Sequence, residues 1–147
     1  MSYLGQGDQV SWPLPVEDFV GLGRIPHQSG WLNRRRDDDN RAVSAALQLT
    51  RLEPLRIRPL NQLSGGERAR ARLARALAVQ APLLLADEPV ASLDPFHQLS
   101  VMTLLRRQCE LGHTVVVVLH DLTLASRFCD RLLLLHEGRA VARGTPR

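Results

Sequence analysis

The sequence contains no lysine: all 19 of its basic residues are arginine, set against 15 acidic residues for a formal net charge of +4. A phosphate-binding loop of the form Gly-x-x-x-x-Gly-Lys-Ser/Thr uses its lysine to reach the β- and γ-phosphates of a nucleotide. Such a loop is therefore excluded from these 147 residues.

Aromatic residues are also scarce, at 4% of the sequence. The basic pI of about 10.3 is typical of many nucleic-acid-binding proteins, but single strands are bound largely by stacking their bases on aromatic side chains. The arginines are scattered except at residues 34–36, and three aspartates follow at once at residues 37–39, which favours a solvated loop over a basic binding tail. We therefore expect no nucleic-acid partner.

Cysteines are few and long apolar runs are missing. Cys109 and Cys129 fit neither a metal-ligand spacing nor a disulfide framework, so we expect reduced thiols. No stretch has the length of a membrane-spanning helix or the pattern of a signal peptide. These absences predict a cytoplasmic protein that reaches a membrane only through a partner.

The most informative part of the sequence is residues 61–95. There Ser64 has the properties of a helix N-cap, and Glu67 stands three residues on, as in a capping box. Gly65 and Gly66 leave the start of this helix bare, so a phosphate group could approach its backbone N–H groups at the positive end of the helix dipole. The pattern predicts a helix from Glu67 to about Val79.

An apolar run at residues 83–86 follows Pro82 and predicts a parallel strand covered on both faces. The run ends in Asp87 and Glu88. Because open α/β sheets bind ligands at the carboxyl ends of their strands, both carboxylates are placed where a ligand would lie.

The rest of the chain predicts further elements. They are a short helix starting at Pro15, a helix at residues 37–49, a helix from Pro95 to Gly112 with Leu99, Met102, Leu105 and Cys109 facing inward, a buried strand at 114–119, a short helix at 122–129, and strands at 131–136 and 139–142 forming a hairpin. Three predicted strands then end in Gln6, in Asp87 and Glu88, and in His120. In a parallel sheet these ends share one edge, so the polar side chains are expected to converge there.

These residues resemble the nucleotide-binding subunit of an ATP-binding-cassette (ABC) transporter. In that resemblance residues 64–66 are the signature motif, 83–88 the Walker B strand and 92–94 the D-loop. Residues 23–27, Gly-Arg-Ile-Pro-His, resemble a segment of importers of iron–siderophore complexes, haem and cobalamin. In this reading His27 is a loop residue that contacts the membrane subunit.

The resemblance implies an α/β, P-loop NTPase-like fold with a mostly parallel sheet. It implies a helical subdomain at about residues 12–62 and a RecA-like core formed by residues 1–11 and 63–147, truncated at the amino terminus. It further implies ATP and Mg²⁺ as cofactors, a second ABC ATPase subunit as head-to-tail partner, and transmembrane permease subunits that hold the protein at the inner face of the membrane.

The resemblance also implies roles for individual residues. Asp87 and Gln6 would hold Mg²⁺, Glu88 would act as the general base and His120 as the switch histidine on the γ-phosphate. The residues expected to contact nucleotide are Gln6, Ser64, Gly65, Gly66, Glu67, Asp87 and Asp94.

Two other functions remain open from the sequence. Without a phosphate-binding loop the polypeptide alone is not expected to turn over ATP, so it could be a non-catalytic remnant or an interaction module that pairs with an intact cassette or membrane subunit. The other is a soluble ABC protein of DNA repair or chromosome organisation, although the long heptads or cysteine pairs typical of that class are missing.

Overall fold

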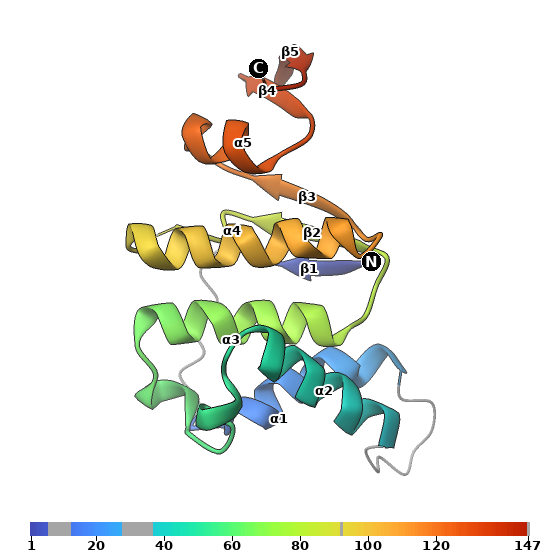
Figure 1. Cartoon of the computed structure of the whole chain (residues 1–147), viewed down its shortest axis with the longest axis vertical. Coiled ribbons are helices and arrows are strands. Elements are labelled where there is room, and N and C mark those ends of the chain that lie inside the picture. Colours follow the sequence, from blue (N-terminus) through green and yellow to red (C-terminus); the bar gives the residue numbers. More distant parts are fainter. Residues whose placement is uncertain (6–12, 28–36, 92, 147) are drawn as a thin grey trace.

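The computed structural model describes residues 1–5, 13–27, 37–91 and 93–146 (Figure 1). Its helices are α1 (Val16–Gly21), α2 (Asp37–Leu49), α3 (Gly65–Ala78), α4 (Pro95–Glu110) and α5 (Leu122–Phe128), with 3₁₀ segments η1 (Leu22–His27), η2 (Glu53–Leu55) and η3 (Leu60–Gln62). Its strands are β1 (Ser2–Leu4), β2 (Leu83–Asp87), β3 (Thr114–Val118), β4 (Leu132–His136) and β5 (Arg139–Gly144).

Strands β1, β2 and β3 form a parallel sheet in that order, with Tyr3 opposite Leu85 and Leu85 opposite Val116. Strands β4 and β5 pair antiparallel in a separate two-stranded sheet. The α/β class and the parallel pairing expected from the sequence are thus confirmed, and so is the carboxyl-terminal hairpin.

One face of the parallel sheet is covered by α3 and α4. Leu84 and Ala86 of β2 are buried in a cluster that also holds Leu73 of α3 and Met102 of α4. Side chains on this face gain the stabilisation of apolar burial, about 1.5–3 kcal/mol for a fully buried leucine. This cluster holds the strands in a fixed position against both helices.

The opposite face of the sheet is open within the described residues. Tyr3 is 59% exposed, Val116 52% and Val118 50%. The prediction that β2 is covered on both faces, and that β3 is buried, is therefore wrong for this structure. A continuous apolar run cannot say how many helical layers lie against a strand, and here the described helices α3 and α4 lie against one side only.

Helices α1, α2 and α3 form a second cluster below the sheet (Figure 1). Its largest fully buried side chains include Phe19, Leu47 and Leu52. Helix α3 contributes to both clusters, with Ala71 and Ala74 facing one and Leu73 facing the other. Its small side chains let both layers approach closely.

Helix α4 differs in detail from its prediction. Met102 and Leu105 are buried as expected, but Leu99 is 38% exposed and Cys109 only half-buried, while Val101 is buried instead. The buried face of α4 is therefore rotated about the helix axis relative to the prediction, and it is formed by Val101, Met102, Leu105 and Gln108. Among the described helices, none combines the length and apolar character needed to cross a membrane.

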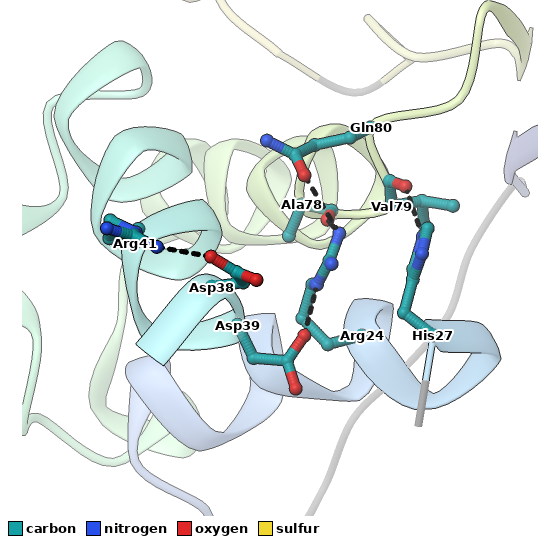
Figure 2. Close-up of polar contacts among 8 residues, drawn as sticks. All are labelled: Arg24, His27, Asp38, Asp39, Arg41, Ala78, Val79 and Gln80. Carbon is teal, nitrogen blue, oxygen red and sulfur yellow. Dashed lines mark hydrogen bonds and ion pairs between the residues drawn. The ribbon is translucent and has the colours of Figure 1, made fainter. Parts of the chain in front are cut away.

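The acidic block at residues 37–39 is also more than a solvated segment. It forms the first turn of α2, where carboxylates interact favourably with the positive end of the helix dipole. Asp39 within it is only 3% exposed and is paired with Arg24 of η1 (Figure 2). The arginines at residues 34–36 lie outside the described residues.

Candidate functional site

Helix α3 begins with the predicted capping box. The backbone N–H of Glu67 donates to Ser64 Oγ at 3.2 Å, and the backbone N–H of Ser64 donates to Glu67 Oε2 at 2.8 Å. The bond from the Ser64 backbone is the main reason that the pKa of Glu67 lies below its ordinary range. Space around Gly65 is open, since a Cβ added there would meet no atom within 4 Å. This helix start is therefore fixed in shape and accessible to an anion.

The carboxyl edge of the sheet brings together the second pair of predicted residues. His120, two residues beyond β3, places Nε2 2.5 Å from Oε1 of Glu88, the residue after β2. The glutamate side chain is 19% exposed and the histidine 81%. The convergence predicted from the parallel strand ends is thus observed for these two residues.

The backbone at Glu88 is unusual. Its φ angle is +46°, in the left-handed region that is uncommon for residues other than glycine. Its N–H donates to the Val118 carbonyl at 3.2 Å, which continues the β2–β3 ladder by one residue. The chain turns sharply at this point, and the turn aims Glu88 along the sheet edge toward His120.

Asp87 ends β2 beside Glu88 and is half-buried. Its Oδ2 accepts a long hydrogen bond of 3.4 Å from the Tyr3 hydroxyl of β1. Oxygen ligands such as this carboxylate suit Mg²⁺, which is commonly held by one or two carboxylates together with substrate phosphates and water. As a single carboxylate, Asp87 is compatible with this kind of site. The described residues contain no group of three or more metal-ligating side chains.

A small depression adjoins this edge. It is lined by Leu4, Gly5, Ala69, Arg72, Glu88 and Pro89, and so joins the end of β1 to α3 and to the end of β2. Arg72 is a basic residue at this depression to which the sequence gave no functional role. Its position eight residues after the cap, on the α3 face turned toward the sheet, depends on tertiary packing. Gln6, the predicted contact of Mg²⁺ and water, lies outside the described residues.

Asp94 caps α4. Its Oδ1 accepts the backbone N–H of His97 at 3.1 Å, and its Oδ2 lies 2.6 Å from His97 Nδ1. These bonds, with the ring bond as the largest contribution, hold the pKa of Asp94 below its ordinary range. The neighbouring Ser92 is outside the described residues.

His97 was missed by the sequence reasoning, yet it connects two of the predicted motifs. A Cβ added at Gly66 would lie 2.8 Å from the Cδ2 atom of the His97 ring, so the ring packs directly on the backbone of the glycine. The starts of α3 and α4 therefore touch through His97, and Asp94 is held near Gly66. The only sequence signal was the position of the histidine three residues after a helix N-cap.

Relatives of this chain are known. The family described as ABC transporter matches residues 1–91. The hemin import ATP-binding protein HmuV of Streptomyces coelicolor is 48% identical over 143 residues, which cover 97% of this chain and 50% of that protein. The protein of the same name from Pseudomonas fluorescens is 45% identical over 151 residues, covering 99% and 57%. The chain thus spans about half the length of the curated relatives it matches.

Solved structures agree in fold. An inward-facing ABC transporter of the metal-chelate type superposes with a TM-score of 0.89 at 28% identity, covering 99% of this chain and 57% of that one. The ATP-binding cassette MJ0796, solved as a dimer in a post-hydrolysis state with ADP and Pi, gives 0.83 at 31% identity, covering 99% and 62%. The chain therefore belongs to the ABC transporter family, of whose ATP-binding cassette it forms a part.

Proposed function

We propose that this chain serves in the ATP-binding subunit of an importer for hemin or a related iron chelate. The observation that carries the nucleotide site is the contact of 2.5 Å between His120 and Glu88 at the carboxyl edge of the sheet. The cargo is supported by the relatives, which are named as hemin import proteins.

In the proposed site Glu88 orients and deprotonates the water that attacks the γ-phosphate. His120 holds this carboxylate through Nε2, and because its ring is 81% exposed it can reach a phosphate as well. Asp87 and Gln6 would hold Mg²⁺, which neutralises phosphate charge when it is bound. The chain's own contribution at this edge is to place a base, its partner and a metal ligand side by side.

The second half of the proposed site is the start of α3. Ser64, Gly65, Gly66 and Glu67 would face the phosphates bound by a second cassette, since the capped helix start is open on its outer side. Asp94, held beside Gly66, would lie at the same junction. A head-to-tail pair of cassettes is supported by the dimeric form of MJ0796.

Permease subunits would dock on the helical layer. This role of about residues 12–62 as a separate subdomain is supported by the apolar cluster that α1, α2 and α3 form apart from the sheet. Leu22 and Ile25 of η1 and Ile57 are exposed on this layer, at 42%, 58% and 78%. His27, proposed from sequence as a permease contact, is exposed too, but its Nε2 also donates to the Val79 carbonyl at 2.7 Å.

The test is to mix this chain with the intact Streptomyces coelicolor relative, altered so that its own signature serine is lost. ATP can then be enclosed only between the phosphate-binding loop of the relative and Ser64–Glu67 of this chain. We expect sedimentation velocity to show association that requires Mg²⁺ and ATP. Ser64→Glu should abolish it by placing a second carboxylate against the phosphates, whereas Ser126→Glu on the exposed surface of α5 should not.

The outcome also separates the two functions considered. Association followed by ATP hydrolysis supports a contribution to a working ATPase. Association without turnover supports a non-catalytic interaction module, and absence of ATP-dependent association contradicts pairing with an intact cassette in either form.

A further inference from the structure

Arg24 of η1 is buried between two helices (Figure 2). Its Nε donates to Asp39 Oδ1 at 2.8 Å, and its Nη1 donates to the Ala78 carbonyl at 2.8 Å and to Gln80 Oε1 at 3.1 Å. The side chains of Arg24 and Asp39 are 7% and 5% exposed. One guanidinium group therefore joins the first turn of α2 to the last residue of α3.

The positive charge of Arg24 is favourable at the carboxyl end of α3. The last carbonyl groups of a helix lack intrahelical partners and carry the negative end of the dipole, so a cation is favourable there. Arg24 donates a hydrogen bond to the Ala78 carbonyl, and His27 donates one of 2.7 Å to the Val79 carbonyl. Two side chains from η1 thus close the carboxyl end of α3 (Figure 2).

Gly23 shows how closely η1 approaches α3. A Cβ at this position would lie 2.3 Å from the Arg75 carbonyl oxygen, which belongs to the backbone and cannot simply rotate away. Glycine is therefore required for the contact. The segment formed by Gly23, Arg24 and His27, here called the α3 clamp, holds the last turn of the helix from three points.

The other end of α3 carries the capping box of Ser64 and Glu67. A helix is stiff, and at about 1.5 Å per residue its 14 residues extend about 21 Å. A small change of tilt at the clamped end displaces the capped end. A change at the α3 clamp would therefore alter where Ser64 and Gly65 lie relative to the sheet.

Stability alone is a weak explanation for the buried pair. Replacing a buried ion pair by apolar groups of similar size is often neutral or stabilising, because desolvation offsets most of the attraction. A planar guanidinium carries several donors in fixed directions, so it holds its partners in a defined geometry. Arg24 uses two of its nitrogen atoms on partners in two different helices, which constrains the angle between those helices.

We propose that Arg24 is a positioning residue for the signature motif, which it aims at the nucleotide of the second cassette through the α3 clamp. The proposal rests on the proposed function. It adds a specific coupling: the helical layer, through η1 and α2, controls the position of Ser64, and a movement of that layer would be transmitted to the phosphates along α3.

The test uses the full chain with the signature-deficient relative described above, and measures the ATP concentration that gives half-maximal association. Arg24→Ala should raise this concentration about tenfold, within the usual range of coupling between two sites. Gly23→Ala, which pushes η1 away from α3, should act in the same direction. Arg41→Ala is the matched control, since Arg41 pairs with Asp38 on the exposed side of the same turn (Figure 2).

A second control separates positioning from loss of stability. Val43→Ala removes two methyl groups from the core between α2 and α3, where Val43 is 1% exposed. It should lower the melting temperature without changing the ATP requirement. If Val43→Ala and Arg24→Ala shift the ATP requirement equally at equal loss of melting temperature, Arg24 has only a structural role and the proposal is overturned.

A third measurement does not depend on nucleotide binding. Spin labels at Gly65→Cys and the exposed Thr103→Cys, in a chain with Cys109→Ser and Cys129→Ser, report the distance from the start of α3 to α4. Arg24→Ala should shift or broaden this distance distribution, and an unchanged distribution overturns the proposal.

Should Arg24→Ala fail to fold, Asp39→Asn, which keeps the shape and one acceptor oxygen, takes its place in both measurements. Wild-type chain that never associates with ATP contradicts the proposed function, and the label distances still decide on Arg24.

Discussion

The imidazole of His97 binds Asp94 through Nδ1 at 2.6 Å and at the same time packs against Gly66. Two helix starts that are 30 residues apart in the sequence are thereby held in contact. The contact explains why the second glycine of the pair Gly65–Gly66 has no room for a side chain while the first has.

A methyl group at Gly66 should therefore be costly. We expect Gly66→Ala to destabilise the fold by about 1–3 kcal/mol, as other overpacked positions do, since its Cβ would lie 2.8 Å from the ring. Gly65→Ala should be neutral or slightly stabilising, because alanine favours a helix over glycine. Urea unfolding of both variants checks this, and the double variant Gly66→Ala/His97→Ala should recover the loss. An equal cost for both glycines would show that the ring contact is unimportant.

The bond to His97 should also be visible in the titration of Asp94. The pKa of this carboxyl is lowered chiefly by the hydrogen bond with the ring, so His97→Ala should raise it toward its ordinary value. Because the pKa in the folded state is the lower one, the interaction stabilises the fold above the ordinary carboxyl range and is lost as the pH falls through the lowered pKa. Carbon-detected NMR of the carboxyl group measures the shift; an unchanged Asp94 pKa in the variant would assign the effect to another group.

The capping box of α3 gives a prediction with a built-in control. Ser64→Ala should cost about 1 kcal/mol of folding stability, the typical value for a lost N-cap. Glu67→Gln keeps a side chain that can accept the Ser64 N–H but cannot titrate. The pKa of Glu67 is lowered in the fold, so the wild-type chain should lose stability relative to Glu67→Gln as the pH falls from neutral to about 3. Parallel urea curves at both pH values decide; equal losses would mean that Glu67 does not contribute as a carboxylate.

Features that depend on neighbours in the sequence were predictable. The capping box lies within four consecutive residues, and Ser64 and Glu67 indicate it by residue type and spacing alone. The meeting of Glu88 with His120 was also predictable, although 32 residues separate them, because the ends of parallel strands share an edge. In both cases a rule about backbone geometry links the residues.

Contacts that depend on the packing of one helix against another were not predictable. Nothing in the sequence says that Arg24 should reach Asp39 and Ala78, or that His97 should lie on Gly66, since these pairs are set by helix angles. The exposure of Val116 was missed for a related reason: four valines in a row indicate a strand, but the number of layers around it is a property of the whole fold.

The open face of the sheet should limit solubility. Val116 and Val118 are half exposed, and Leu133 of the hairpin is 60% exposed. Exposed apolar side chains on strands favour association between chains. We expect Val116→Thr, which keeps the β-branched shape, to raise the concentration at which light scattering detects aggregates. Val115→Thr is the control: it lies on the face that packs against the core and should lower stability instead. Equal behaviour of both variants would contradict the assignment of the two faces.

The last prediction concerns catalysis by the chain alone. Glu88 and His120 are in place at the sheet edge, but the sequence has no lysine and hence no phosphate-binding loop of the usual kind. Positioning and charge stabilisation of the phosphates supply most of the rate in phosphoryl transfer, so the base by itself has no fixed substrate to act on. The purified chain should therefore release no phosphate from ATP above the buffer background in a coupled assay. The decisive control is Glu88→Gln: magnesium-dependent hydrolysis by the wild-type chain that disappears in this variant would show that the chain binds and turns over ATP without the loop.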